Sequence, residues 1–404
     1  MVIRNLSDLP KDALFGKTVL VRVDYNVPRK EGKVLNTFRL QKTLPTLNYL
    51  SEAGARVVLI SHLGRPRGHY TPEDSLSLLS SLLAELLERE VLFLKGDIND
   101  TLKGTIEAQK PGAILLLENI RFFPQEETND SAFAASLAAL GDFYVNDAFS
   151  VAHRAHASVD SLPRMMPGFA GFFFEQEMSL IERAIENPAR PLMAIVAGSK
   201  VSTKLGLLES LIEKVQILVL GGGIANTFLA ALGYNMQKSL VERNMIKTAR
   251  GILETEPASG RRILLPTDVA CAKDLEGRAL EVVPVDQIPS DKMALDFGPQ
   301  SISEVFQSLQ GVRTVLWNGP LGFFETPPFD QGTVRVAQEV ARLTEQENLI
   351  SIAGGGETAS VMIQAGVVDK LTGLSFSGGA FLEALEGKIL PGVEALSFSS
   401  AKAS

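Results

Sequence analysis

The sequence predicts an α/β protein with two parallel sheets, each wound by helices, and a helical segment between the two. Three observations support this fold class: short apolar segments recur along the chain, amphipathic segments separate them, and the chain has 404 residues. Apolar strands that alternate with helices are typical of parallel sheets that are buried on both faces. A chain of this length usually forms two domains of roughly 150–200 residues, or one barrel of about 250 residues with an appendage.

Ten short segments rich in branched apolar residues are predicted as strands. Ten strands are too many for one regular sheet, and they fall into two groups of five, so we expect two sheets. The predicted strands are 18–23, 56–60, 91–94, 113–117 and 142–146, followed by 192–197, 215–220, 262–265, 314–317 and 349–353.

Amphipathic segments between these strands are predicted as helices, most clearly at 38–53, 76–87, 334–344 and 359–365. The boundary between the two groups of strands is expected near 168–191. There the apolar sequence PGFAGFFF gives way to a charged helical segment that ends in prolines. A helix that lies between two domains and is ended by prolines fits a hinge.

The composition argues against several classes of protein. Hydrophobic residues make up 45% of the chain and charged residues 21%, as in ordinary globular proteins. A net charge of −8 disfavours binding to nucleic acid or to an anionic membrane. The single cysteine, Cys271, cannot form an internal disulfide, which fits a reducing cytoplasm. No signal peptide and no apolar segment of about 20 residues is apparent, so we expect a cytoplasmic protein.

Cationic and polar side chains follow the predicted strands of the first group. Parallel strands bind ligands at their carboxyl ends, so these side chains should meet at one edge of the sheet. Arginine matches carboxylate and phosphate oxygens two at a time, and a ligand with several anionic groups is therefore expected. A lone charge is more often a solvated loop residue, but the set is harder to explain in that way. Its members are Asp24, Asn26, Arg39, His62, Arg65, Arg121, His153, Arg154 and His156.

The three histidines offer a second interpretation, a metal site. His62, His153 and His156 lack a compact ligand spacing joined to a carboxylate, which makes this interpretation the weaker one.

Glycine-rich turns follow three predicted strands of the second group, at 198–204, 221–223 and 354–358. Glycine allows backbone N–H groups to approach an anion, and the start of the following helix adds favourable partial charge. Lys200 and Lys204 are four residues apart and are predicted to share one helical face beside the same phosphates. One such turn is more often simple strand–helix packing, whereas three turns beside two lysines favour a nucleotide site.

Two other nucleotide motifs were compared with the sequence. The P-loop pattern fails, because the only Gly-Lys-Thr, Gly16–Thr18, has Lys11 where the leading glycine belongs. The dinucleotide fingerprint of dehydrogenases is matched by Gly354, Gly356 and Ala359. However, the segment LTGLSF after Asp369 offers no acid for a ribose, and a dehydrogenase leaves the arginines of the first half unexplained.

Long sequence motifs resemble the phosphoglycerate kinase family, in family order and over nearly the whole chain. They are RVDYNVP (22–28), SHLGRP (61–66), ENIRFFP (118–124), VNDAFSVAHRAHAS (145–158), GSKVSTK (198–204), LGGGIANTFL (220–229), WNGPLGFFE (317–325), AGGGET (353–358) and LEGKILPGVEAL (385–396).

The resemblance implies two Rossmann-like domains joined by a hinge helix. The expected division is a phosphoglycerate-binding domain at 1–170, a hinge at 171–190 and a nucleotide-binding domain at 191–388, with 389–404 packed back on the first domain. It also implies a monomeric cytoplasmic kinase of glycolysis and gluconeogenesis. The implied reaction is reversible phosphoryl transfer from 1,3-bisphosphoglycerate to ADP, with Mg²⁺ as Mg-ADP or Mg-ATP.

The resemblance also implies roles for individual residues. Arg39 and Lys200 would face the transferring phosphoryl group, and we hypothesise that N–H groups near Gly355 and Gly378 share that task, because the two half-sites are expected on separate domains. Glu325 would hold the ribose and Glu357 the metal. The phosphoglycerate would be bound by Asp24, Asn26, Arg39, His62, Arg65, Arg121 and Arg154, and the nucleotide by Lys204, Asn318, Glu325, Gly355, Gly356, Glu357 and Thr358.

The sequence departs from the family pattern at three places. Glu357 stands where the family usually has Asp, Phe376 removes a hydroxyl from the S-T-G-G-G-A motif, and Ala294 replaces a glycine that lies near the adenine. Three classes therefore remain open from the sequence: a kinase, a nicotinamide dehydrogenase, and a catalytically silent protein that keeps the fold.

Overall fold

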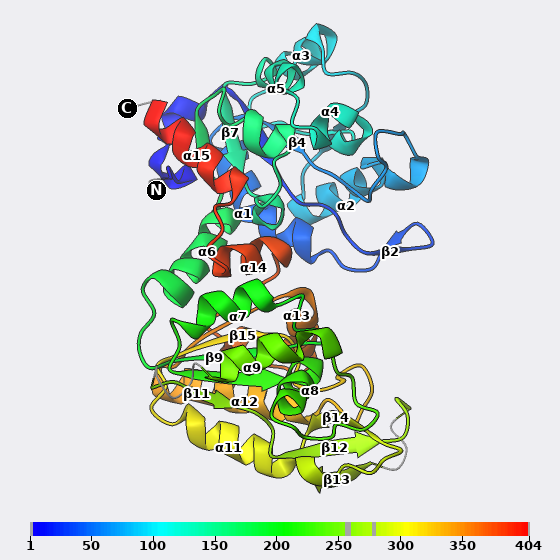
Figure 1. Ribbon diagram of the computed structural model, residues 1–404. Coiled ribbons are helices and arrows are strands. Elements are labelled where there is room, and N and C mark those ends of the chain that lie inside the picture. Colours follow the sequence, from blue (N-terminus) through cyan, green and yellow to red (C-terminus); the bar gives the residue numbers. More distant parts are fainter. Residues whose placement is uncertain (1–2, 255–259, 277–279, 403–404) are drawn as a thin grey trace. The chain divides into compact units, whose positions relative to one another are not determined.

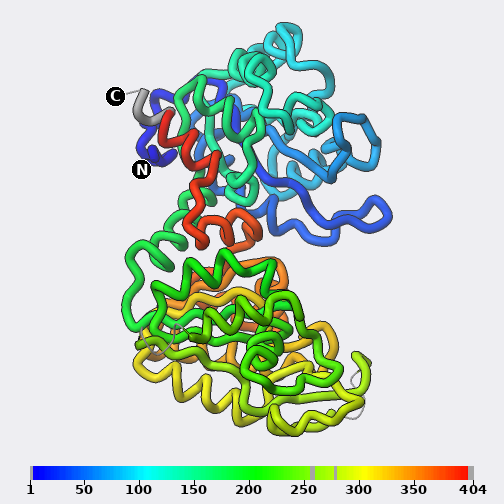
Figure 2. The backbone as a smooth tube through the Cα atoms, viewed as in Figure 1, coloured from blue at the N-terminus to red at the C-terminus, as the bar shows by residue number. Residues whose placement is uncertain are grey.

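The computed structural model describes residues 3–254, 260–276 and 280–402 (Figures 1 and 2). The chain divides into two compact units, of which the first is Met1–Met178 with Ile389–Ser404 and the second is Ser179–Lys388. The division falls within helix α6 (Phe172–Ile181), which a short π-helical segment, η7 (Glu182–Glu186), continues. That this segment acts as a hinge stays a prediction.

The first unit is built on a six-stranded sheet in which all neighbouring strands are parallel. Its strand order is β5-β6-β4-β1-β7-β8. The five predicted strands are confirmed, and the sixth, β8, was missed because its three residues lie inside the segment that was read as a domain boundary. The strands are β1 (Thr18–Arg22), β4 (Arg56–Ile60), β5 (Val91–Leu94), β6 (Ile114–Leu117), β7 (Phe143–Asn146) and β8 (Gly168–Ala170).

Helices cover the first sheet and connect its strands. Two of them start at side-chain caps: Asn99 accepts from the N–H of Leu102 at 3.1 Å, and Asp130 accepts from that of Phe133 at 2.7 Å. The helices are α1 (Phe38–Glu52), α2 (Ser77–Leu87), α3 (Asp100–Glu107), α4 (Pro124–Glu127), α5 (Ser131–Ala138) and α15 (Pro391–Lys402). Short turns are η1 (Leu6–Asp8), η2 (Lys11–Leu14), η3 (Pro72–Asp74), η4 (Ile120–Phe122), η5 (Phe149–Val151) and η6 (Ala157–Ser161), and β2 (Arg29–Lys30) pairs with β3 (Lys33–Val34) as a small hairpin.

The last helix, α15, returns to the first unit (Figure 2) and packs against η6 and β8. The N–H of Gly392 donates to the carbonyl of Ala152 at 2.9 Å, and Arg164 Nη2 donates to Glu394 Oε2 at 2.8 Å. These contacts join two segments that are far apart in the sequence.

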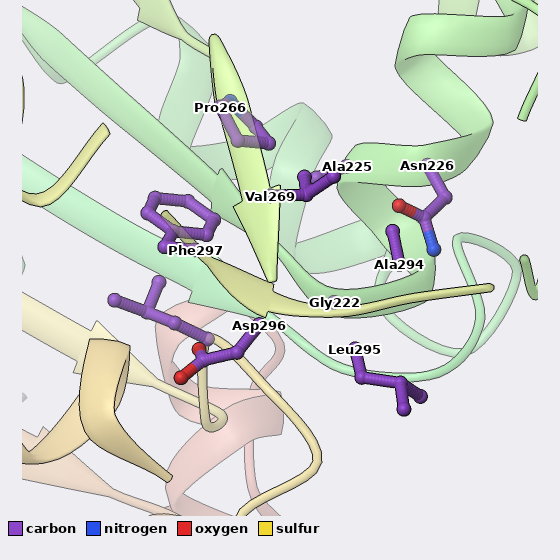
Figure 3. A pocket seen from close by; sticks show the side chains of 10 residues that line it. Gly222, Ala225, Asn226, Pro266, Val269, Ala294, Leu295, Asp296 and Phe297 are labelled. Carbon is purple, nitrogen blue, oxygen red and sulfur yellow. The ribbon is translucent and has the colours of Figure 1, made fainter. Parts of the chain in front are cut away.

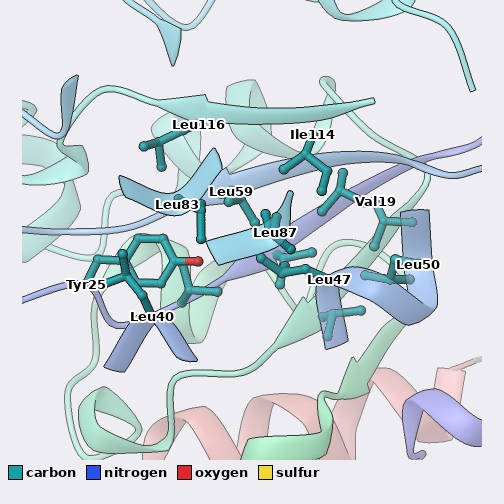
Figure 4. Packing of buried hydrophobic residues seen from close by; sticks show 14 of the residues in the cluster. Val19, Tyr25, Leu40, Leu47, Leu50, Leu59, Leu83, Leu87, Ile114 and Leu116 are labelled. Carbon is teal, nitrogen blue, oxygen red and sulfur yellow. The ribbon is translucent and has the colours of Figure 1, made fainter. Parts of the chain in front are cut away.

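The core of the first unit lies between its sheet and helices α1 and α2 (Figure 4). Val19, Leu59 and Leu116 project from the strands, and Leu47 and Leu83 project from the two helices. All five side chains are fully buried. Burial on both faces explains why the strands read as continuous apolar segments rather than alternating ones.

The second unit has its own six-stranded parallel sheet, in the order β11-β10-β9-β15-β16-β17. The five predicted strands are again confirmed, so each sheet has six strands instead of the five expected. The missed strand, β17, is only three residues long and contains a glycine. The strands are β9 (Leu192–Ala197), β10 (Ile217–Gly221), β11 (Arg262–Leu264), β15 (Thr314–Asn318), β16 (Ile350–Gly354) and β17 (Gly373–Ser375).

A three-stranded antiparallel sheet in the second unit was not predicted. Its order is β13-β12-β14, with β12 (Asp268–Ala272) between β13 (Glu281–Pro284) and β14 (Met293–Phe297). The strands of this sheet are short. In addition, β13 is largely exposed, so the sequence of β13 carries no continuous apolar signal.

Helices of the second unit include all those predicted there. The helices are α7 (Leu205–Ile212), α8 (Gly222–Ala231), α9 (Ile246–Glu254), α11 (Pro299–Leu309), α12 (Gln331–Glu347), α13 (Gly356–Gln364) and α14 (Gly379–Leu385), with short turns η8 (Arg243–Met245), η9 (Val285–Gln287) and η10 (Val368–Lys370). Within the described ranges, no helix combines the length and the hydrophobicity needed to cross a membrane.

The buried strands predict a marked loss of stability when one core side chain is shortened. Leu59→Ala removes a fully buried side chain from β4 and leaves a cavity, so the free energy of unfolding should fall by about 2–5 kcal/mol. Leu35→Ala is the matched control, because Leu35 is 62% exposed and its loss should change stability by about 0.5 kcal/mol or less. Urea unfolding followed by circular dichroism measures both, and equal effects would contradict the described core.

Candidate functional site

The carboxyl ends of the first sheet bring the predicted anion-binding side chains together. Asp24 follows β1, His62 follows β4, and Arg121 lies in η4 after β6. Arg39 is the second residue of α1, within the helix predicted at 38–53. Because all six strands are parallel, these loops share one edge.

Asp24 is the centre of this cluster. Its carboxylate is buried; Oδ2 accepts hydrogen bonds from Arg39 Nη1 and Ser150 Oγ, and Oδ1 accepts from the N–H of Asn26 at 3.0 Å. His62 Nε2 lies 3.8 Å from Oδ1. The side chain of Arg39 is nevertheless 35% exposed, and its guanidinium has further N–H donors to offer to a ligand.

A second set of contacts orders the loop after β4. Asn26 Oδ1 accepts from the N–H of Gly64 at 3.0 Å, and Arg121 Nη1 donates to the carbonyl of Gly64 at 2.8 Å. Gly64 has φ +66°, in the region that favours glycine. Arg65 follows directly and is exposed, and Arg154, after η5, is half-buried.

The cluster holds several cations close to one another. Burial, together with the charges of Arg22 and Arg154, lowers the pKa of Arg121 to about 10, and the side chain stays a cation at neutral pH. Burial and the charges of Arg22, Arg121 and Arg154 likewise lower the pKa of His156 to about 3. Concentrated positive charge in a partly desolvated site favours an anionic ligand.

Sequence reasoning missed Arg22, the last residue of β1. Its side chain is fully buried, and it contacts His62 and Ser158, which in turn contacts Glu126. The one available signal was a charged residue inside the apolar strand TVLVRV. Ser150, which also contacts Asp24, carried no such signal.

Asp147, after β7, links this edge to helix α6. Its Oδ1 accepts from the N–H groups of Phe173 at 2.9 Å and Phe174 at 3.2 Å, in the first turn of α6. Burial raises the pKa of Asp147 to about 7, although the Thr46 hydroxyl and the two N–H groups partly oppose this shift.

In the second unit, a lysine and an asparagine meet at the carboxyl ends of the strands. Lys204 Nζ donates to Oδ1 of Asn318, and Asn318 Nδ2 donates to the carbonyl of Gly354 at 2.6 Å. Burial lowers the pKa of Lys204, while the nearby carboxylates of Glu357 and Glu386 raise it.

The turn before α13 requires glycine. Gly355 has φ +108°, and a Cβ atom there would lie 2.7 Å from Asn318 Nδ2 and 3.2 Å from Thr358 Oγ1. Thr358 Oγ1 accepts from the N–H of Gly319 at 2.8 Å. Gly356 and Glu357, in the first turn of α13, are exposed. The start of this helix can therefore offer backbone N–H groups and the Glu357 carboxylate to a ligand.

Two expectations for this half change with the structure. Lys200 and Lys204 do not share a helical face, because α7 begins only at Leu205 and the segment from Gly198 to Lys204 is a loop. The glycine turn, rather than helical spacing, sets their placement, and Lys200 is exposed. Glu325 is an exposed loop residue after β15, and Gly378, with φ +52°, precedes α14.

A pocket in the second unit lies between α8 and the small antiparallel sheet (Figure 3). Figure 3 shows Asn226 and Ala294 on one side and Pro266 and Phe297 on the other. Gly222, Ala225, Val269, Leu295, Asp296 and Leu321 complete its lining. Most of these lining residues are apolar, as in small-molecule pockets generally.

The part of the chain that the structure describes contains no group of three or more His, Cys, Asp or Glu side chains that could hold a metal ion by themselves. His62, His153 and His156 therefore form no such group. The dinucleotide fingerprint spans the end of β16 and the start of α13, but the next strand, β17, ends at Ser375 and has no acid there. The first observation weakens the histidine metal site, and the second weakens the dehydrogenase.

Comparison with known proteins identifies one family. A family model described as phosphoglycerate kinase matches residues 8–388. A protein named phosphoglycerate kinase from Methylorubrum extorquens (strain PA1) is 48% identical over 384 residues, which are 95% of this chain and 96% of the relative. One of the same name from Rhodospirillum centenum is 48% identical over 397 residues, 98% of this chain and all of the relative.

Solved structures give the same result. The phosphoglycerate kinase of Coxiella burnetii has a TM-score of 0.90 and 39% sequence identity, with 98% of this chain and 99% of that chain covered. The phosphoglycerate kinase of Pyrococcus horikoshii OT3 has a TM-score of 0.84 and 29% identity, with 99% and 100% covered.

The raised pKa of Asp147 predicts a pH-dependent contribution to stability. Between its ordinary value of 3.8 and about 7, the folded chain keeps a proton that the unfolded chain has released. The free energy of unfolding should therefore fall as the pH rises through this window, by up to ~1.4 kcal/mol per pH unit from this group. Asp147→Asn keeps an acceptor for α6 and should remove that contribution.

Urea unfolding at pH 5 and pH 7.5 measures the difference. The change in unfolding free energy between the two pH values should be smaller in Asp147→Asn than in the wild type. Asp12→Asn is the control, because Asp12 is exposed. A variant with the wild-type pH dependence would show that Asp147 is charged in the folded chain throughout this range.

Proposed function

Because the chain belongs to the phosphoglycerate kinase family, we propose that its two units carry the two half-sites of one magnesium-dependent phosphoryl transfer. The activity of the family is the reversible transfer from 1,3-bisphosphoglycerate to ADP, which gives 3-phosphoglycerate and ATP in glycolysis. The chain is accordingly a phosphotransferase with a carboxyl group as acceptor.

The observation that carries the proposal is the cationic edge of the first sheet. In a chain with a net charge of −8, arginines follow the carboxyl ends of β1, β4, β6 and β7, and one of them, Arg39, donates to the buried Asp24. We propose that Arg65, Arg121 and Arg154 bind the phosphate of phosphoglycerate, since arginine matches its oxygens in pairs. Asp24, Asn26 and His62 then bind its polar and carboxyl end, beside Arg39.

The nucleotide belongs to the second unit in this proposal. Lys204, Asn318 and the first turn of α13, Gly355 to Thr358, bind the phosphates, and Glu325 binds the ribose. The pocket lined by Ala294 takes the nucleobase, where the methyl group of Ala294 narrows the space that a glycine would leave. The support is the placement of an apolar pocket and a glycine-rich helix start in the same unit.

The chemistry requires alignment and charge rather than proton transfer. The acceptor carboxylate of 3-phosphoglycerate is already an anion, so no general base is needed. We assign the stabilisation of the transferring group to Arg39, Lys200 and the N–H groups near Gly355 and Gly378. Direct transfer requires the two ligands to meet, so we also propose that the units close about the segment 168–191 and exclude water from the acyl phosphate.

Glu357 is the residue that we propose as the link to Mg²⁺. Magnesium usually keeps several waters and is held by one or two carboxylates together with substrate phosphates. Glu357, a single exposed carboxylate in the first turn of α13, fits this mode of binding, which does not require a set of protein ligands around the metal. When bound, the metal would neutralise phosphate charge. We further propose that the enzyme acts as a monomer in the cytoplasm, as the family resemblance implies.

A coupled assay of ATP-dependent phosphorylation of 3-phosphoglycerate, with and without Mg²⁺, tests the proposed function. Turnover that requires both the acid and the metal supports a working kinase. Absence of turnover in the purified, folded chain would favour the catalytically silent alternative. A nicotinamide absorbance in the purified protein would favour the dehydrogenase.

Arg39→Ala should separate catalysis from nucleotide binding. Loss of a cation at the transferring group is expected to reduce kcat by about 10³-fold or more, with the KM for ATP nearly unchanged. Lys42→Ala removes a positive charge from the same helix and is expected to keep most of the wild-type kcat. If kcat of Arg39→Ala stays close to the wild-type value, Arg39 has no role at the transition state.

Glu357→Asp should preserve or raise magnesium-dependent turnover, because it restores the carboxylate that the family usually has at this position. Glu357→Gln, which removes the charge, should raise the Mg²⁺ concentration needed for half-maximal rate. Complete loss of activity in Glu357→Asp would mean that the site has been rebuilt around the longer side chain.

A further inference from the structure

Arg22 is a fully buried cation on β1 that no step of the proposed chemistry uses. Isolated buried charges are costly, so such a residue needs both hydrogen bonds and a counter-charge. Its position next to the strand end, two residues before Asp24, places it directly behind the candidate phosphoglycerate site.

All three nitrogen atoms of its guanidinium have a contact. Nε donates to Ser158 Oγ at 2.8 Å, Nη1 donates to the carbonyl of Val23 at 2.5 Å, and Nη2 lies 3.2 Å from His62 Nδ1. Three groups from different parts of the chain therefore hold the guanidinium of Arg22, and they fix the direction in which Nη2 points toward His62.

Glu126 supplies the counter-charge through Ser158. The Ser158 hydroxyl donates to Glu126 Oε1 at 2.6 Å, and its N–H donates to Oε2 at 2.8 Å. Tyr144 OH donates to the carbonyl of Ser158 at 2.8 Å, which fixes the position of that residue from β7. Glu126 is fully buried, and burial raises its pKa, although the charge of Arg22 and the hydrogen bonds from Ser158 partly oppose this shift.

The contact with His62 determines which ring nitrogen carries the proton. A guanidinium has only donors and stays protonated in proteins, so Nη2 can only donate. His62 Nδ1 must then be the acceptor, and the proton of the neutral ring must lie on Nε2. Nε2 is the nitrogen that lies 3.8 Å from Asp24 Oδ1, which is longer than a direct hydrogen bond.

The charged groups around His62 also oppose a second proton on the ring. They are Arg22 from β1, Arg39 from α1, Arg121 from η4 and His156, with the carboxylate of Asp24 on the opposite side. Burial and then these cations hold the pKa of His62 well below its ordinary value. The ring is thus neutral at neutral pH, and its available N–H is at Nε2.

We propose that Arg22 is a positioning residue that holds His62 in the neutral Nε2–H form, so that His62 always presents a hydrogen-bond donor to the bound acid. This inference rests on the proposed function, since it takes the edge around Asp24 as the phosphoglycerate site. A histidine with an acceptor at Nε2 would repel the oxygens of an anion, and Arg22 excludes that form.

The wild-type protein provides the first test. Two-bond ¹H–¹⁵N spectra distinguish the ring nitrogens of a neutral histidine from one another, and His62→Gln assigns the signal among the four histidines of the chain. We expect His62 in the Nε2–H form with no titration between pH 5.5 and pH 8.5. A proton on Nδ1, or a ring that titrates in this range, would overturn the proposal.

The second test removes the donor. Arg22→Met leaves Glu126 buried without its partner and can prevent folding, so Arg22→Met/Glu126→Gln removes both charges together. The double variant should lose the fixed tautomer, and its KM for 3-phosphoglycerate should rise about tenfold or more, with the KM for ATP unchanged. Glu126→Gln alone keeps Arg22 and should keep the Nε2–H form, as should Arg22→Lys in part.

The two measurements separate failure of this inference from failure of the proposed function. If the double variant folds and keeps the Nε2–H form, Arg22 does not control the tautomer, whatever the activity. If the tautomer changes but the KM for 3-phosphoglycerate does not, His62 does not contact the acid, and the assigned positioning role is wrong. If the wild type binds no 3-phosphoglycerate while the tautomer is as expected, the proposed function fails instead.

Discussion

Parallel alignment of the strands is the constraint on which both candidate sites depend. In a parallel sheet every strand ends at the same edge, so loops that are more than 100 residues apart in the sequence, such as those after β1 and β7, meet there. The first unit uses this edge for arginines and a buried carboxylate. The second uses it for glycine turns, a lysine and an asparagine. The same architecture therefore provides two sites of different chemistry, because only the loops differ.

A buried pair of charged residues behind this edge of the first sheet orders the candidate phosphoglycerate site. Arg22 and Glu126 are both fully buried, and their pairing through Ser158 connects β1, α4 and η6. This pairing fixes side chains that would otherwise be free to rotate. Burial, and then the charge of Arg22, lowers the pKa values of His62 and Arg121. A site that is charged before its ligand arrives needs little reorganisation when the anion binds.

The sequence was sufficient for the fold class, for ten of the twelve main-sheet strands, and for most of the polar residues that follow the strands at each edge. Long apolar segments and turn glycines are local signals, so they can be recognised in the sequence without knowledge of tertiary contacts. The short strands β8 and β17 and the sheet of β12 to β14 could not be predicted, because segments of three to five residues carry too weak a pattern to show that they pair. Arg22 escaped notice for a different reason: its role depends on Ser158 and His62, which only the folded chain brings near it. The helical face expected for Lys200 and Lys204 was wrong, since spacing alone does not show where a helix begins.

A crystal structure of the whole chain with 3-phosphoglycerate is the most direct measurement of the central claim, that the carboxyl edge of the first sheet binds the acid. The account predicts the phosphate beside Arg65, Arg121 and Arg154 and the carboxylate within hydrogen-bond distance of His62 Nε2. The acid bound instead at the amino ends of the strands, for example in the pocket beside Arg89 and Lys110, would contradict it.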